Sequence, residues 1–245
     1  MFPTLRAYSL AIARATDGGW GLELPGVSAA IAPAIPERSV VNCVVYDGAD
    51  ALEAQLERVA DEYDRAGVLA WTVWVHESDK HAQSVLEAAG NVLDAEPMAQ
   101  GRELNEVDPP DEGELDLVPD PSPADFDPVI ERSYGWPGFG RALAAFPPEF
   151  HPYLARHEGE PACCLGTMDH NGDAAVTFVG TAPEARGRGL ATRLMRRALA
   201  DARDRGCTTT TLQATRLGYP VYARVGYRDF GRVQMWERRK PAPTP

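Results

Sequence analysis

Residues 182–194 read APEARGRGLATRL, and this stretch decides how the whole chain is interpreted. Two arginines and two glycines alternate at 186–189, directly before an apolar run with helical spacing. Three interpretations compete: a nucleic-acid patch, a dinucleotide-binding turn and a cradle for a phosphorylated cofactor. The composition and the flanking sequence distinguish between them.

The composition describes a globular, acidic protein. The chain has 245 residues, a formal net charge of −12 at pH 7 and 44% hydrophobic residues. That hydrophobic content supports a packed core, and the length suits one large domain or two small ones. The acidic charge argues against broad binding of nucleic acid, which needs a positive surface. It favours cationic small molecules or basic peptides as partners.

No segment is typical of export or membrane insertion. Residues 5–15 (LRAYSLAIARA) are apolar but interrupted by Arg6 and Arg14, which predicts an amphipathic surface helix rather than a signal peptide. No stretch approaches the ~20 apolar residues of a membrane span. We expect a cytoplasmic monomer or homodimer that holds no metal and has reduced, buried thiols, since no CxxC spacing occurs among its cysteines, Cys43, Cys163, Cys164 and Cys207.

An internal duplication is the second prediction. The Pro-, Asp- and Glu-rich segment 105–128 divides the chain near its middle. The same order of strand, helix, strand, helix is predicted on each side of it: at 39–46, 49–67, 68–75 and 79–90, and again at 173–181, 190–206, 208–214 and 219–226, with a last strand around 233–237. We therefore expect domains at 1–107 and 108–245, although any α/β chain shows this order.

The start of the second domain carries two weaker signals. Residues 114–118 (ELDLV) predict an edge strand, and Ser122 or Asp125 is suited to cap a following helix.

The halves differ where a strand passes into a helix. The first half has only DGA at 47–49, and the second has APEARGRG at 182–189. A helix N-terminus carries unpaired N–H groups and partial positive charge, and a glycine-rich turn lets them approach a phosphate. Neither GxxxxGK[ST] nor GxGxxG is present, and an RNA-binding RGG segment would lie in a disordered basic tract. A phosphate cradle and a plain strand–helix turn are the alternatives that these residues leave open.

The surrounding pattern resembles the GNAT superfamily of acyl-CoA-dependent N-acetyltransferases. The motif R/Q-x-x-G-x-G/A matches residues 186–191, an amphipathic helix follows, and YPVYARVGYRDFG follows at 219–231. The resemblance is strong over about 172–237 and weaker over 115–168. It implies an α/β (α+β) fold with two GNAT-like mixed-sheet halves, the N-terminal one degenerate. It also implies direct transfer of an acetyl group from acetyl-CoA, the co-substrate, to an amine in a ternary complex.

The resemblance also implies a cofactor site. The pantetheine arm of CoA would bind to Val179, Gly180 and Thr181, at the end of a strand. The pyrophosphate would be held by the loop and helix start, with charge from two arginines: Arg186, Gly187, Arg188, Gly189, Leu190, Ala191 and Thr192. Thr215 stands where many members carry an asparagine that touches the cofactor.

Roles in the reaction are implied for further residues. Tyr222 would protonate the leaving thiolate, with Tyr219 as the fallback donor, because a phenol with a pKa near ~10 keeps its proton at neutral pH. The first half has Leu86 at the matching position. The acceptor pocket would be lined from segment 133–140 by aromatic residues whose other role is packing: Tyr134, Trp136 and Phe139. No residue stands out as the general base that deprotonates the amine. A chain of water molecules is one alternative, and the others are four surface residues: Glu184, Asp173, His151 and His157.

Two other functions are compatible with these residues. The chain could be a non-catalytic acyl-CoA-binding or sensing module, which turnover with any amine would distinguish from an enzyme. It could also be a structural or interaction protein whose loop holds no ligand, which a CoA-binding assay would settle.

Overall fold

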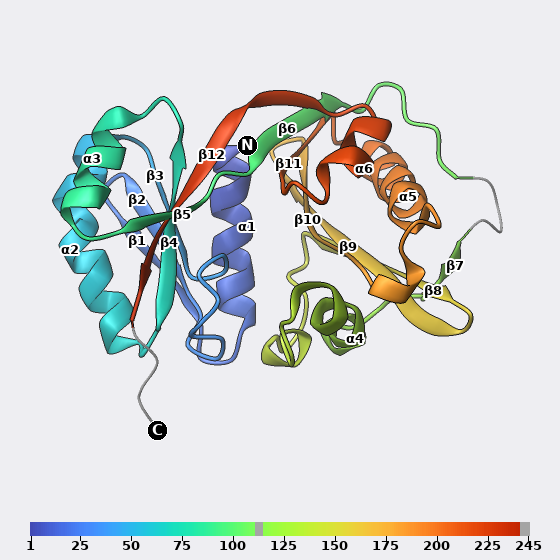
Figure 1. Cartoon of the computed structure of the whole chain (residues 1–245), viewed down its shortest axis with the longest axis horizontal. Helices are drawn as coiled ribbons and strands as arrows, with labels where there is room; N and C mark the ends of the chain where they lie inside the picture. Colours follow the sequence, from blue (N-terminus) through green and yellow to red (C-terminus); the bar gives the residue numbers. More distant parts are fainter. Residues whose placement is uncertain (111–114, 241–245) are drawn as a thin grey trace. The chain divides into compact units, whose positions relative to one another are not determined.

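The computed structural model describes residues 1–110 and 115–240. The chain forms two compact units (Figure 1). The N-terminal unit comprises Phe2, residues 4–98 and the chain from Gly231 onward, and the C-terminal unit comprises Met1, Pro3 and residues 99–230. The chain therefore returns to its first unit after completing the second.

The N-terminal unit is a mixed sheet with helices. Its elements are α1 (Phe2–Ala15), β1 (Trp20–Leu24), β2 (Val27–Ile31), β3 (Cys43–Tyr46), α2 (Ala49–Arg65), β4 (Ala70–His76), α3 (Lys80–Ala88), β5 (Val92–Ala95) and most of β12 (Arg228–Arg239). The strand order is β1-β2-β3-β4-β12, with β5 also paired to β12. Among the strand pairs named here, β3 and β4 are parallel and the others are antiparallel.

Helix α2 supplies one side of the core of this unit. Its buried side chains recur at helical spacing, and Tyr63 stacks on Trp71 of β4 with ring centroids 4.9 Å apart. Helix α1 buries a face that includes Leu5 and Ile12, as the amphipathic pattern of residues 5–15 predicts. Within residues 1–110 and 115–240, no helix is long and apolar enough to cross a membrane.

The last strand differs from the expected domain division. The sequence predicts that residues 108–245 form one domain, whereas β12 from Gly231 onward lies in the N-terminal unit. Residues 233–239 pair antiparallel with the whole of β4, and Trp236 is buried in the core of this unit. This pairing covers the β4 edge, which would otherwise present unpaired backbone groups.

The C-terminal unit carries the glycine-rich loop. Its elements are β6 (Met98–Glu103), β7 (Asp116–Leu117), α4 (Pro123–Tyr134), η1 (Gly140–Ala142), β8 (Phe150–His157), β9 (Glu160–His170), β10 (Asp173–Thr181), η2 (Pro183–Ala185), α5 (Leu190–Asp204), β11 (Thr209–Ala214) and α6 (Tyr219–Arg224). The strand order is β6-β11-β10-β9-β8-β7, and β10 and β11 are parallel. The four elements predicted around the loop match β10, α5, β11 and α6 to within two residues.

Local capping explains where α4 begins. Ser122 and Asp125 act together: the Ser122 hydroxyl accepts from the Asp125 N–H, and the Asp125 carboxylate accepts from the Ser122 N–H at 2.7 Å. The predicted edge strand at 114–118 is β7, reduced to Asp116–Leu117, and Glu114 lies outside the described residues. All four cysteines are buried and free.

We predict that Trp236→Ala destabilises the N-terminal unit by about 3–5 kcal/mol, because a large buried side chain is truncated. Urea denaturation followed by tryptophan fluorescence measures this, since Trp20, Trp71 and Trp74 lie in that unit. Phe230 on the same strand is 65% exposed, so the control Phe230→Ala should shift the unfolding free energy by less than about 0.5 kcal/mol. Equal effects of the two variants would contradict this assignment of β12.

Candidate functional site

Strand β10 parts from β11 within the C-terminal unit. The two strands pair in parallel only at Asp173, Ala174 and Ala175 of β10, although β11 continues to Ala214. The pairing with β11 therefore ends at Ala175, whereas β10 continues to Thr181. At the end of β10, backbone groups of Val179, Gly180 and Thr181 that are not bonded within the chain can meet an extended ligand.

The other edge of β10 is continuous with β9 except at one bulge. The register shifts between Thr177 and Gly180, and pairing resumes at Gly180 and Thr181. Phe178, inside the bulge, has φ +53°, a left-handed conformation that is strained for a bulky residue. The bulge bends the strand end that follows it.

The last turn of α4 lies against this bulge. A Cβ atom on Gly180 would lie 2.6 Å from the Ser133 hydroxyl oxygen, so a side chain at position 180 would require Ser133 to move. The Tyr134 hydroxyl donates a hydrogen bond to the Val179 carbonyl at 2.8 Å. The end of α4 and the end of β10 thus form one surface.

The glycine-rich loop has the backbone that its sequence predicts. Gly187 and Gly189 both have φ +75°, and Gly189 is the N-cap of α5. The first N–H groups of α5 lack acceptors within the helix. Arg186 Nε donates to the Thr181 carbonyl at 3.2 Å, which ties the loop to the end of β10.

Arg193, in the first turn of α5, contacts the loop and is a residue that sequence reasoning missed. Its guanidinium donates to the Arg188 carbonyl at 3.0 Å and lies over Gly189, while its Nε is buried without a partner. Arg193 follows the N-cap by four residues, so it projects along the same helix face toward the loop. That spacing is the signal by which it could have been found.

Tyr222 is buried on α6, with 7% of its surface exposed. Burial raises the pKa of its phenol above the usual 10, and the charge that Cys163 would carry as a thiolate adds to the effect. Cys163 pairs with Thr181 across the strands, and its Sγ lies 3.4 Å from the Thr181 hydroxyl. The phenol is therefore protonated at neutral pH and within electrostatic reach of the strand end.

The other residues expected around α6 have local partners. Tyr219 is 38% exposed, and its hydroxyl donates to Asp229 at 3.0 Å. The Thr215 hydroxyl accepts from the Gly218 N–H at 3.2 Å, in the turn that begins α6. Thr215 thus shapes this turn, and its expected contact with a cofactor stays a prediction.

The three aromatic residues expected at the acceptor form a continuous chain of rings. Tyr134 and Trp136 have centroids 5.1 Å apart, Trp136 and Phe139 5.8 Å, and Phe139 and Phe178 4.8 Å. Phe139 is buried and joins the core, whereas Tyr134 is exposed and Trp136 is half-buried. The chain of rings therefore runs from the bulge to the surface within this unit.

The four candidate bases are engaged in separate local contacts. Asp173 accepts hydrogen bonds from Thr209 and Thr211 at the start of β10, at the end opposite the bulge. Glu184 pairs with Arg132, and His157 lies 3.7 Å from the adjacent Glu158. The structure brings none of these three to the bulge by a contact among the described residues.

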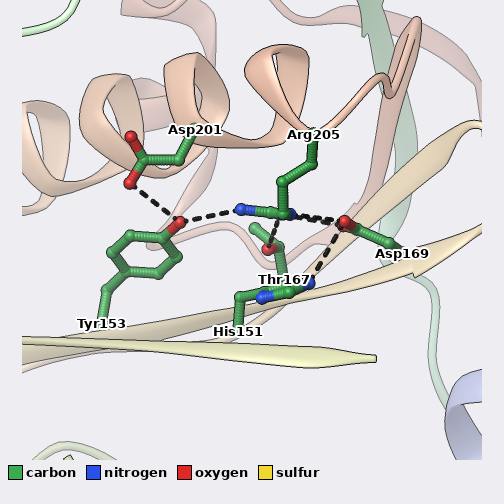
Figure 2. Close-up of polar contacts among 6 residues, drawn as sticks. All are labelled: His151, Tyr153, Thr167, Asp169, Asp201 and Arg205. Atoms are coloured by element: carbon green, nitrogen blue, oxygen red, sulfur yellow. Dashed lines mark hydrogen bonds and ion pairs between the residues drawn. The ribbon is translucent and has the colours of Figure 1, made fainter. Parts of the chain in front are cut away.

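His151, the fourth candidate, belongs to a polar network between strands β8 and β9 and the C-terminal half of α5 (Figure 2). Its Nε2 lies 3.2 Å from Asp169, which also accepts from Arg205 at 2.6 and 3.0 Å. Tyr153 accepts from Arg205 and donates to Asp201. Burial and the Arg205 charge lower the pKa of His151, and Asp169 opposes them.

A hollow of about 370 Å³ adjoins the network. It is lined by residues of the network and by apolar side chains of the β7 segment, among them His151, Tyr153, Asp201, Leu117 and Pro121. Arg197 and Asp201, two of the charged residues that line it, pair with each other, and we assign the hollow no ligand.

Comparisons with known proteins agree with this geometry. The model of the acetyltransferase (GNAT) family matches residues 115–227. The structure of a GCN5-related N-acetyltransferase from Kribbella flavida is similar, with 15% sequence identity and a TM-score of 0.66. The match covers 98% of this chain and 95% of that protein. A putative GNAT acetyltransferase from Novosphingobium aromaticivorans is similar with 17% sequence identity and a TM-score of 0.62. The match covers 98% of this chain and 97% of that protein. No curated protein matches the sequence.

A tandem GNAT protein from the clavulanic acid biosynthesis pathway is also similar, over 92% of this chain and 82% of its own, at 16% identity and a TM-score of 0.57. At these identities the likeness concerns the fold, and it extends over both units. The predicted α/β (α+β) fold with GNAT-like mixed sheets is confirmed. The degeneracy of the N-terminal half stays a prediction.

We predict that Arg205→Gln raises the pKa of His151, which burial and Arg205 hold below 6.5 in the wild type. Because this pKa is lowered in the folded state, the stability that it contributes is present above pH 6.5 and is lost as the pH falls through the folded pKa. NMR titration of the His151 ring measures the shift. The control Arg197→Gln removes a cation of α5 that pairs with Asp201 instead. A larger rise of the His151 pKa in Arg197→Gln than in Arg205→Gln would contradict the role given to Arg205.

Proposed function

We propose that this chain is an N-acetyltransferase that moves the acetyl group of acetyl-CoA directly to an amine, because the acetyltransferase (GNAT) family model matches residues 115–227. The observation that carries the proposal is the parting of β10 from β11 immediately before the glycine-rich loop. The alternative, a non-catalytic acyl-CoA-binding module, has the same strand and loop and differs in having no turnover.

The end of β10 is suited to the pantetheine arm of CoA. Val179, Gly180 and Thr181 lack a β11 partner, so their backbone groups other than the Val179 and Thr181 carbonyls, which accept from Tyr134 and Arg186, can bind the amides of the arm as a strand would. The arm is extended and has amides of its own, which is the chemistry that such an edge recognises.

The loop is suited to the pyrophosphate. The two left-handed glycines place no side chain over the N–H groups at the start of α5, and successive N–H groups in such a conformation form an anion-binding concavity. The first turn of α5 has no acidic residue. Arg186, Arg188 and Arg193 add positive charge beside it.

The corresponding helix of the N-terminal unit opposes an anion. Helix α2 begins after Gly48, with Asp50 in its first turn. Asp47 precedes the N-cap and pairs with Arg6 of α1. Two carboxylates at this helix start would repel a phosphate, which supports a single CoA site in the C-terminal unit.

Tyr222 is suited to act as the general acid. When bound, acetyl-CoA supplies a thioester whose carbonyl carbon is attacked by the neutral amine nitrogen, and the carbon–sulfur bond breaks. The departing thiolate takes the Tyr222 proton. After the attack the amine nitrogen releases a proton, which passes through water to Tyr222. The raised pKa keeps the phenol protonated at neutral pH and also makes it a weaker acid than an exposed tyrosine, so the proposed role depends on its position.

The acceptor is proposed as an amine of a small molecule or a peptide that is cationic in solution and loses one proton to water before it attacks. The net charge of −12 favours attraction of a cation by the chain as a whole. Tyr134 and Trp136 lie at the solvent-facing end of the chain of aromatic rings, beside the end of β10. These rings are proposed to line the acceptor pocket.

We predict that calorimetry gives one CoA site per wild-type chain and that Gly189→Glu abolishes it. A glutamate at this N-cap places negative charge where the phosphates would bind, and its side chain lies over the exposed N–H groups. Circular dichroism checks that the variant stays folded, because φ +75° is strained for glutamate.

Gly48→Glu is the matched control, since Gly48 is the N-cap of α2 and has open space around it. It should leave CoA affinity unchanged. Two equivalent sites in the wild type, or wild-type affinity in a folded Gly189→Glu, would contradict the proposed site.

We predict that Tyr222→Phe lowers kcat by about 10²–10⁴ and leaves the KM for acetyl-CoA nearly unchanged, because the ring still packs and only the acid is lost. Thiol release with a turned-over amine measures both constants. Tyr219→Phe is the control: its hydroxyl is bonded to Asp229, so its kcat should stay near that of the wild type. A large loss in Tyr219→Phe with none in Tyr222→Phe would transfer the role to Tyr219.

A further inference from the structure

The direction of the bound cofactor follows from the proposed function. The loop that would hold the pyrophosphate comes directly after Thr181. A pantetheine arm that starts there and follows β10 runs back past Gly180 to Val179. Its thioester therefore lies near Val179, and the acyl chain extends toward the bulge around Phe178.

The space beside Val179 is already occupied by the last turn of α4. The Ser133 hydroxyl fills the position that a side chain on residue 180 would need. The Tyr134 hydroxyl is bonded to the Val179 carbonyl at 2.8 Å. An acyl chain that continues past the thioester meets Tyr134.

Tyr134 is held at both ends. Its hydroxyl is fixed on β10, and its ring lies 5.1 Å from Trp136, which in turn leads through Phe139 to Phe178. Phe178 is itself fixed by the bulge, with its ring buried. A side chain held in this way cannot move aside for a longer ligand without breaking these contacts. Its 38% exposure leaves one part of its surface open to a ligand.

We propose that Tyr134 sets the acyl-chain length of the reaction, and that the wild-type enzyme uses short acyl-CoA thioesters such as acetyl-CoA because the Tyr134 ring closes the space beyond Val179. The inference rests on the proposed function. It assigns Tyr134 to specificity for the acyl donor, as a residue that touches the end of the acyl group.

The test compares acetyl-CoA with hexanoyl-CoA in three proteins: the wild type, Tyr134→Ala and Tyr134→Phe. Tyr134→Ala should raise the ratio of kcat/KM for hexanoyl-CoA to that for acetyl-CoA by at least about tenfold, the discrimination expected from one or more methylenes in an apolar pocket. Tyr134→Phe keeps the ring and removes only the hydrogen bond, so its ratio should stay within about threefold of the wild type. Calorimetric affinities for the two thioesters give the same comparison without turnover.

The outcomes separate this inference from the proposed function. A Tyr134→Ala protein that binds CoA like the wild type but keeps the wild-type acyl preference would overturn the inference alone. An equal change in Tyr134→Phe would also overturn it, because the hydrogen bond rather than the ring volume would then set the preference. A wild-type chain that binds no CoA would contradict the proposed function itself.

Discussion

The site depends on the parting of two parallel strands. Strand β10 stays with β11 for three residues and then leaves it, while β9 keeps its other edge paired. Beyond the parting, β10 has a bulge against β9, with Phe178 in a left-handed conformation and glycine at position 180, where a side chain would require the Ser133 hydroxyl to move. The bulge bends the end of β10 that precedes the glycine-rich loop.

Electrostatics then distinguish the two units. Both place a helix after a strand, with glycine at the N-cap, but Gly48 is extended whereas Gly189 is left-handed and follows a longer loop. The first turn of α5 has no acid and has arginines beside it, whereas α2 starts between Asp47 and Asp50. The start of α5 therefore favours an anion and the start of α2 opposes one. Loop geometry and side-chain charge together account for the single proposed site.

Sequence reasoning succeeded where local signals were strong. Elements β10, α5, β11 and α6 have β-branched runs, apolar periodicity and closing glycines, and their bounds were predicted to within two residues. The all-buried strand β2 (VSAAI) has small residues without alternation, and it was missed. The pairing of β12 with β4 joins residues far apart in sequence, so no local pattern reveals it. For the same reason, the hydrogen bond of Tyr134 to Val179 became visible only in the structure.

Amide hydrogen exchange with and without CoA tests the central claim most directly, because it reports binding along the backbone without requiring the acceptor. We expect CoA to slow exchange at residues 179–181 and 187–192, where the strand edge and the start of α5 offer free N–H groups. We expect no change at residues 47–52, at the start of α2. Unchanged exchange at 179–192 in the presence of bound CoA, or equal protection at 47–52, would contradict the account.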